Sequence, residues 1–75
     1  MMPSMKITPS LCRAARALLD MSQGDLATAS SVSRRTVSSF EAGGSAIPAT
    51  LAAIQRALEE AGVEFLEGGG IRRRQ

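Results

Sequence analysis

The chain has 75 residues and a net charge of +2, from nine basic and seven acidic side chains. This length predicts one small domain, near the lower limit at which a hydrophobic core is self-sufficient. With one cysteine, Cys12, and no histidine, the composition excludes an intrachain disulfide, a common four-ligand zinc site, and Ser-His-Asp or Cys-His catalysis. We therefore expect no enzyme, no metal and no cofactor, with oligomerisation as the remaining source of extra stability.

Charge is distributed unevenly along the chain. Residues 1–40 hold five basic and two acidic groups, residues 41–71 hold one basic and five acidic, and residues 72–74 are all arginine. This asymmetry indicates either a nucleic-acid-binding face on the first half or simply a solvated surface. Because no apolar run is long enough for a signal peptide or a membrane span, we expect a cytoplasmic protein without a membrane partner.

The first predicted element is a helix over about residues 9–19. Thr8 supplies an N-cap oxygen, and Pro9 suits the first helical position because its missing N–H is not needed there. Apolar residues then recur with helical spacing, at Leu11, Ala14, Ala15, Leu18 and Leu19.

A second, shorter helix is predicted over roughly residues 23–30. Ser22 stands three residues before Asp25, a variant of the capping box in which the serine oxygen accepts a backbone N–H and the carboxylate reaches back. The inward side holds mainly small residues around Leu26, which allows another helix to approach closely.

The third predicted helix, Arg34 to Glu41, follows a brief turn. Ser33 is its expected N-cap, and Gly43 or Gly44 is its expected left-handed C-cap. The helix has an apolar face and, opposite it, a polar face with the spacing i, i+1, i+4, i+5. Val37 and Phe40 form the apolar face, and Arg34, Arg35, Ser38 and Ser39 form the polar face.

A fourth helix is predicted between Pro48 and Gly62, on apolar residues spaced by four, three and four. After it, VEFLE predicts a short strand or hairpin over residues 63–66. The basic run at residues 72–74 is either a solvated terminal tail or a segment that binds a nucleic-acid backbone.

Together these elements predict an all-α fold, a compact domain of four to five helices with a short C-terminal strand or hairpin. The domain spans residues 1–75, with its core over about 9–62 and a C-terminal strand and basic tail over 63–75. The expected core side chains are Leu18, Leu26, Val37, Phe40, Leu51, Ile54 and Leu58.

Two short helices joined by a brief turn, the second polar on its outer face, form a helix-turn-helix arrangement. The stretch SQGDLATASSVSRRTVSSFEAG, residues 22–43, resembles the DNA-binding motif of the Xre/Cro repressor-like regulators, which have a lambda repressor-like domain. The shared features are the Ser-Gln start, the Leu-Ala pair, the Val-Ser step, a β-branched residue in the third helix and the closing Glu-x-Gly. The resemblance covers about residues 9–66. One departure is Ser31, where the family usually has glycine; in a left-handed conformation serine costs about 1 kcal/mol more.

The resemblance implies contacts with double-stranded DNA. An exposed arginine in the first turn of a recognition helix pairs bidentately with guanine O6 and N7, although phosphate contacts alone are the alternative. The implied base-contacting residues are Arg34, Arg35, Ser39 and Ser38. The implied backbone-contacting residues are Gln23, Arg16, Thr36, Gly43, Gly44 and Ser45, and the two glycines have the alternative of acting only as a C-cap.

By the same resemblance, Arg16 and Glu41 form a structural salt bridge that ties the first helix to the end of the third. The alternative is two unpaired surface charges of little energetic consequence. Dimerisation is expected through the fourth helix and the following strand, at Val63, Phe65 and Leu66, because a strand with an open edge pairs with its copy across a two-fold axis.

The expected function is that of a homodimeric transcriptional regulator, most simply a repressor of phage or mobile-element type, acting on its own promoter among others and reading a palindromic operator in the major groove. Two alternatives are a helix-turn-helix scaffold that binds proteins as an antiactivator, and an antitoxin. A steep fall of affinity with salt distinguishes DNA binding from a purely protein-binding role.

Overall fold

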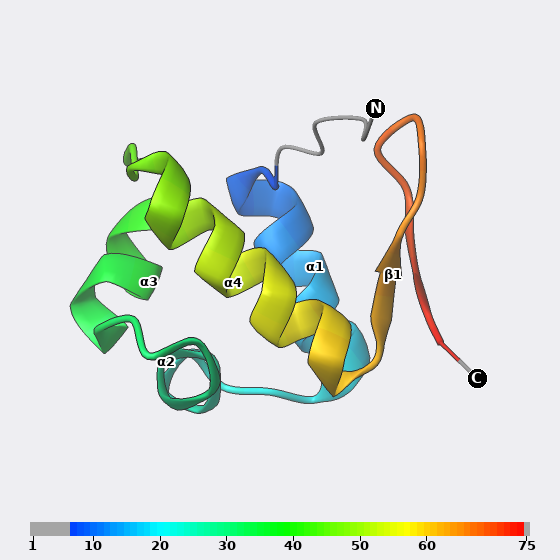
Figure 1. Cartoon of the computed structure of the whole chain (residues 1–75), viewed down its shortest axis with the longest axis horizontal. Helices are drawn as coiled ribbons and strands as arrows, with labels where there is room; N and C mark the ends of the chain where they lie inside the picture. The colour runs from blue at the N-terminus through cyan, green and yellow to red at the C-terminus, as the bar shows by residue number, and fades with distance from the viewer. Residues whose placement is uncertain (1–6, 75) are drawn as a thin grey trace.

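The computed structural model describes residues 7–74 and contains four helices followed by a two-stranded hairpin (Figure 1). The elements are α1 (Pro9–Leu19), α2 (Gln23–Ser30), α3 (Arg34–Glu41), α4 (Pro48–Ala61), β1 (Val63–Phe65) and β2 (Ile71–Arg73). The fold is therefore the mostly helical domain with a small C-terminal hairpin that the sequence predicts.

Local capping explains where the helices begin. Thr8 Oγ1 accepts a hydrogen bond from the Leu11 N–H at 3.1 Å, and Ser33 Oγ accepts one from the Thr36 N–H at 3.1 Å. These bonds satisfy amide groups that have no partner within the helix. α4 begins instead at a proline, whose fixed φ suits the first helical position and which has no N–H to satisfy.

The core lies between α1, α3, α4 and the hairpin, and α2 closes it from one end (Figure 1). Of the side chains expected there, Leu26, Val37, Phe40, Ile54 and Leu58 are buried, and Leu51 packs against them half-buried. The prediction for Leu18 is wrong, because its side chain is 40% exposed. The buried face of α1 is centred on Cys12 and Ala15, and Leu18 is turned away by about 100° from its half-buried neighbour Leu19.

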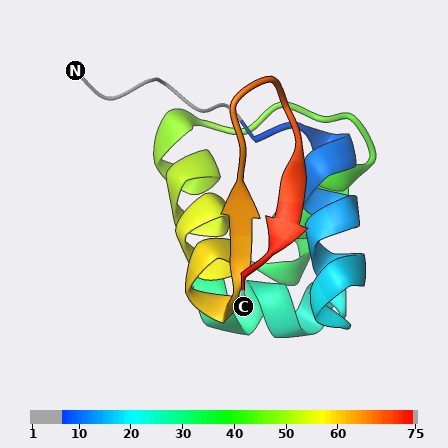
Figure 2. The ribbon, with the colours of Figure 1, turned by 90° about the vertical axis from the view of Figure 1, so that its right-hand side faces the viewer.

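The C-terminal basic run belongs largely to a strand rather than to a free tail, although its arginine side chains are exposed. Ile71–Arg73 pairs antiparallel with β1, with Val63 opposite Arg73, Glu64 opposite Arg72 and Phe65 opposite Ile71. β1 therefore has one edge occupied within its own chain, which corrects the expectation of a lone open strand. Figure 2 shows the hairpin lying across α1 and α4. Val63 on the hairpin is fully buried and belongs to the core.

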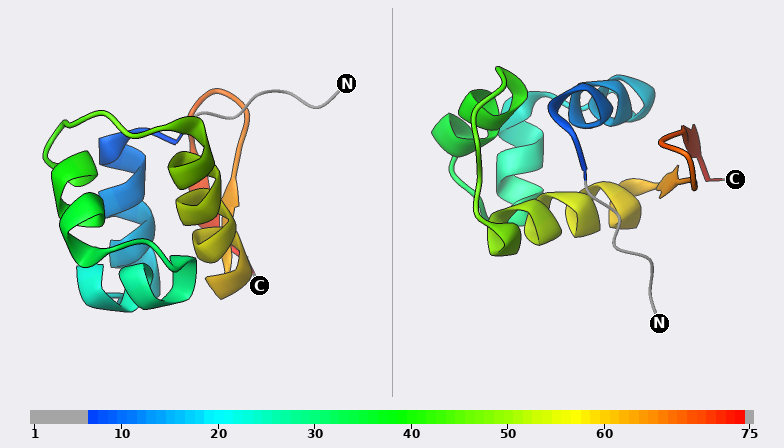
Figure 3. Two further views of the ribbon diagram at one scale, coloured as in Figure 1. Left: turned by 60° about the vertical axis from the view of Figure 1, so that its left-hand side comes forward. Right: turned by 90° about the horizontal axis from the view of Figure 1, so that it is seen from above.

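α3 and the hairpin lie at opposite ends of the molecule in both Figure 1 and the view from above in Figure 3. The domain measures 29 × 26 × 18 Å between Cα atoms, and these two elements mark the ends of its long dimension. As a result, the polar face of α3 and the three C-terminal arginines belong to different surfaces.

Candidate nucleic-acid interface

α2 and α3 pack against each other through a turn with a left-handed residue. Ser31 has φ 59° and ψ 28°, and the Val32 N–H donates to the Ala27 carbonyl at 3.2 Å. This is the position where the family usually has glycine, so serine here adopts the glycine-like conformation directly. The serine side chain therefore does not prevent a left-handed turn between α2 and α3.

The start of α2 is fixed by a complete capping box. Ser22 Oγ accepts from the Asp25 N–H at 2.9 Å, while Asp25 Oδ2 accepts from the Ser22 N–H at 3.0 Å. The bonds with Ser22 lower the pKa of Asp25, so the carboxylate stays ionised at the positive end of the helix dipole.

α3 presents two distinct faces. Val37 is fully buried and Phe40 is 4% exposed, which anchors the helix on the core. The opposite face is exposed and consists of Arg34, Arg35, Ser38 and Ser39, while Thr36 is half-buried at its margin. Within residues 7–74 neither arginine has an ion-pair or hydrogen-bond partner, so both guanidinium groups are free to meet an external anion.

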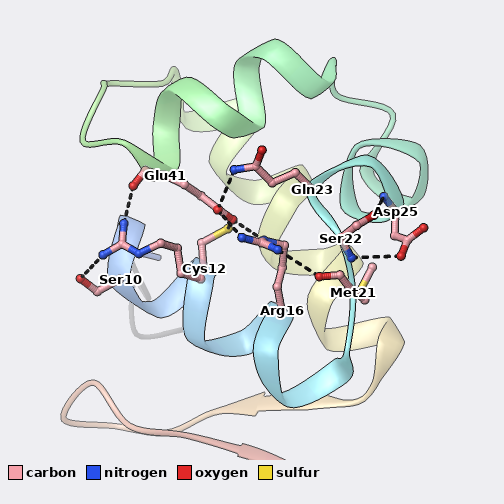
Figure 4. A network of polar contacts seen from close by, with 9 residues as sticks. Ser10, Cys12, Arg16, Met21, Ser22, Gln23, Asp25 and Glu41 are labelled. Carbon is pink, nitrogen blue, oxygen red and sulfur yellow. Dashed lines mark hydrogen bonds and ion pairs between the residues drawn. The ribbon is translucent and has the colours of Figure 1, made fainter.

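The end of α3 is tied to α1 and α2 by the buried carboxylate of Glu41 (Figure 4). Arg16 donates to it twice, from Nη2 to Oε1 at 2.6 Å and from Nε to Oε2 at 2.7 Å. The Cys12 thiol donates to Oε2 at 3.0 Å, and Gln23 Nε2 donates to Oε1 at 3.1 Å. The expected Arg16–Glu41 salt bridge is therefore present, and two further donors join it.

These contacts explain the protonation states of the cluster. Burial alone would raise the pKa of Glu41, but the hydrogen bonds from Arg16, Cys12 and Gln23 together lower it to about 2. Burial, followed by the neighbouring Glu41 carboxylate, raises the pKa of the Cys12 thiol to about 12. The thiol is therefore neutral and acts as a hydrogen-bond donor, and Arg16, whose pKa is raised chiefly by its bond to Glu41, remains charged.

Arg16 and Gln23 are thus held in place by contacts within the chain. Arg16 also donates from Nη1 to the Met21 carbonyl at 3.0 Å, and its side chain is only 18% exposed. The half-buried Gln23 side chain points from the start of α2 toward Glu41 (Figure 4). Both residues connect the start of the helix-turn-helix unit to the end of α3.

Gly43 and Gly44 end α3 in a Schellman motif. The Gly43 N–H donates to the Phe40 carbonyl at 3.0 Å and the Gly44 N–H donates to the Ser39 carbonyl at 2.9 Å. Gly43 has φ 104°, whereas a Cβ on Gly44 would lie 2.7 Å from the Ser39 carbonyl oxygen. Their amides are therefore used by the helix end, and the exposed Ser45 follows directly.

Arg13 is a residue of this region that the sequence alone does not single out. Its Nη1 donates to the Glu41 carbonyl oxygen and its Nη2 donates to Ser10 Oγ at 3.3 Å, and the residue is exposed. Its place beside α3 depends on a contact between residues 28 positions apart, which helical spacing does not reveal. The only available sequence signal is its position one turn before Arg16.

The residues expected to mediate dimerisation lie on the hairpin, away from α3. The side chain of Val63 is fully buried, whereas Phe65 and Leu66 are half-buried. Across the strands Arg72 Nε forms an ion pair with Glu64 Oε1 at 2.7 Å, on side chains that are 65% and 44% exposed.

Within residues 7–74 no helix is long and apolar enough to cross a membrane, and no group of three or more His, Cys, Asp or Glu side chains is arranged to hold a metal ion.

A packed helix pair with an exposed, basic second helix defines a DNA-binding helix-turn-helix domain. The helix-turn-helix family model HTH_3 matches residues 13–65, well over half of the chain. The chain therefore belongs to this family of Xre and lambda-repressor-like proteins, and it is a DNA-binding helix-turn-helix regulator. The family is one of regulatory domains rather than of enzymes. A search of curated proteins gives no match to the chain.

Proposed function

We propose that the chain is a homodimeric repressor that reads a palindromic operator in the major groove, in the cytoplasm, and that its own promoter is among its targets. The observation that carries this proposal is the exposed face of α3, whose first turn holds two arginines without a partner among residues 7–74. A repressor requires only stable occupancy of a promoter, which a single DNA-binding domain can provide.

Base recognition falls to the exposed face of α3. An arginine fork matches guanine O6 and N7, and a correct bidentate pair contributes roughly 1–3 kcal/mol of discrimination. Arg34 and Arg35 occupy the first helical turn, from which side chains reach base edges, and one turn later Ser38 and Ser39 contact a base or a nearby phosphate.

The backbone contacts surround this face and fix its register on the duplex. At the start of α2, Gln23 and the free amides of the helix N-terminus face one phosphate, and Arg16 supports them with the N–H groups that Glu41 and Met21 leave unused. Thr36 contacts the backbone of the same DNA strand. At the C-terminal end of α3, Gly43 and Gly44 have no side chain and so allow the DNA backbone to approach closely, and the Ser45 hydroxyl donates to a phosphate there.

Dimerisation through the hairpin, at Val63, Phe65 and Leu66, completes the proposal. Two recognition helices must lie about 34 Å apart to enter successive major grooves on one face of B-DNA. Because α3 and the hairpin lie at opposite ends of the 29 Å axis, the long axes of two chains joined at their hairpins must be inclined to each other to give this spacing. With its side chain buried, Val63 contributes only its backbone, so the side-chain contacts come from Phe65 and Leu66.

Selection of bound duplexes from a random pool, with competitor DNA present, tests the operator. We expect a palindromic consensus whose enrichment is lost at one position per half-site when Arg35→Ala or Arg34→Ala is used. The matched control is Arg56→Ala, which removes an exposed arginine from α4. Absence of enrichment for the unmodified chain would favour the protein-binding antiactivator, and co-purification with a toxin would favour an antitoxin.

Sedimentation of the full chain tests the dimer. Leu66→Ser should weaken self-association at least tenfold, whereas Leu18→Ser, which alters the 40% exposed leucine on α1, should leave it unchanged. The reverse order of effects would place the interface on α1 and reject the hairpin. Operator-driven repression is then measured with a reporter gene, where an activator would raise expression instead of lowering it.

A further inference from the structure

The C-terminal end of α3 has a positive charge that comes from another helix. The carboxylate of Glu41 is balanced by Arg16 at 2.6 Å, and the buried Cys12 thiol is neutral. Arg13 donates only to uncharged acceptors, the Glu41 carbonyl and the Ser10 hydroxyl. Arg13, Arg16 and Glu41 together therefore carry one net positive charge, and that charge is on the exposed side chain of Arg13.

The two bonds also fix where that charge lies. Arg13 belongs to α1, and its fork bridges the last carbonyl of α3 and the first turn of α1. A cation at a helix C-terminus is favoured by the helix dipole, so the contact holds the guanidinium at this point rather than leaving it free in solvent. The remaining N–H groups of Arg13 stay available to an external acceptor.

This position matches the geometry of a major groove. An eight-residue helix is about 12 Å long, close to the groove width of about 12 Å, so α3 lying across the groove would bring its two ends near opposite phosphate walls. Arg34 and Arg35 supply positive charge at one end. At the other end the glycine amides are used inside the Schellman motif, and among residues 7–74 the neighbouring charges of Arg16 and Glu41 balance each other.

We propose that Arg13 is a backbone-phosphate contact that positions the C-terminal end of the recognition helix in the groove. Its partner is the DNA phosphate at the groove edge opposite the one nearest Arg34. Ser10 orients the guanidinium and lies beside the same phosphate. The inference rests on the proposed docking of α3, and it assigns the contact at the end of α3 to a charged residue of α1 instead of the glycine amides.

The salt dependence of binding to a non-specific duplex measures the Arg13 phosphate contact. Each neutralised phosphate contributes about 0.9 to the magnitude of the slope of log affinity against log salt concentration. The probe is a fluorescein-labelled duplex of mixed sequence, titrated with the full chain between about 50 and 200 mM NaCl. Arg13→Gln keeps a donor for the Glu41 carbonyl but removes the charge. We expect its slope to fall by about 0.9 per bound chain, whereas Arg56→Gln, the matched charge change on α4, leaves the slope unchanged.

Arg13→Lys separates charge from mere structural support. It retains the positive charge without the fork, so it should keep the unmodified slope even if its unfolding midpoint falls. A lysine variant with the reduced slope of Arg13→Gln would overturn the proposal, since displacement of α3 would then explain both results. An unchanged slope in Arg13→Gln would also overturn it.

A second titration, on a duplex selected by the unmodified chain, distinguishes failure of this inference from failure of the proposed function. If Arg34→Gln and Arg35→Gln weaken binding to the selected duplex while Arg13→Gln leaves the salt slope unchanged, only the Arg13 contact is rejected. If Arg34→Gln and Arg35→Gln bind the selected duplex as tightly as the unmodified chain, docking through α3 itself is rejected.

Discussion

Glu41 is the only buried charged residue among residues 7–74, and its surroundings determine whether burial is tolerable. An ionised carboxylate loses several kcal/mol of solvation on burial, which only a close partner and further hydrogen bonds can offset. Glu41 has both, from donors on α1 and α2, and its backbone carbonyl accepts from Arg13. One side chain thus fixes the orientation of α3 relative to the two preceding helices.

Replacement of Glu41 by glutamine should lower the free energy of unfolding by about 3 kcal/mol at pH 7, because it leaves Arg16 as a poorly paired, largely buried charge. The effect should depend on pH. Because the folded-state pKa of Glu41 is about 2, below its ordinary value of 4.5, its stabilisation is complete above pH 4.5 and is lost as pH falls toward 2.

Urea unfolding followed by far-ultraviolet circular dichroism checks this, since the chain has no tryptophan or tyrosine for fluorescence. The difference between the unmodified chain and Glu41→Gln should shrink between pH 7 and pH 2.5. An equal difference at the two pH values would show that the ionised carboxylate is not the source of the stabilisation.

Gly44 is constrained by contact and not by its dihedral angles. A methyl group at this position would meet the Ser39 carbonyl oxygen at 2.7 Å, so Gly44→Ala should destabilise the fold by about 1–3 kcal/mol. Gly24→Ala is the matched control, because it lies inside α2 with its nearest neighbour at an ordinary 3.6 Å. It should stabilise by about 0.5–1 kcal/mol, as alanine does in a helix. Thermal midpoints measured by circular dichroism should move in opposite directions.

At the level of elements, local signals predict the helices well. The capping residues Thr8, Ser22 and Ser33 act as the sequence indicates, and the observed α1, α2 and α3 have the expected bounds. The predictions that the structure corrects depend on contacts between distant parts of the chain. Nothing local distinguishes Leu18 from Leu19, since only packing decides which side of α1 the hairpin covers.

The C-terminal arginines illustrate the same limit. A terminal basic run has no apolar alternation, so its sequence does not predict a strand. Ile71–Arg73 becomes one because β1 supplies the hydrogen-bonding partner and Arg72 finds Glu64 across the hairpin. Likewise, the salt bridge at Glu41 follows from the resemblance, but its bonds from Cys12 and Gln23 appear only once three helices are assembled.

The turn between α2 and α3 permits a direct test of element geometry. Ser31 has φ 59°, a conformation that glycine adopts at lower cost, so Ser31→Gly should raise the free energy of unfolding by about 0.5–1 kcal/mol. Ser45→Gly is the control, because Ser45 is not at positive φ and glycine there only adds freedom to the unfolded chain. If Ser31→Gly and Ser45→Gly shift the urea midpoint equally, or if Ser31→Gly lowers it, the left-handed backbone of Ser31 is not a source of strain.

At the scale of the whole molecule, the hairpin and α3 occupy opposite ends of one small core (Figures 1 and 3). β1 packs on α4 and β2 packs on α1, so the hairpin completes the core between the two longest helices. The α3 end and the hairpin end are therefore connected through α1 and α4. The hairpin should not unfold separately from the helices.

Val63 tests that cooperativity. Its side chain is fully buried, so Val63→Ala should cost about 2 kcal/mol and should lower hydrogen-exchange protection in α4 and in the hairpin together. Arg73→Ala, which changes the exposed residue opposite Val63, should change stability by less than about 0.5 kcal/mol. Exchange that increases only in the hairpin would indicate a separate unit. If protection falls in α4 and in the hairpin together, deletion of residues 63–75 would also destabilise the helix-turn-helix unit. Dimerisation should therefore be tested with point variants at Leu66 and not with this deletion.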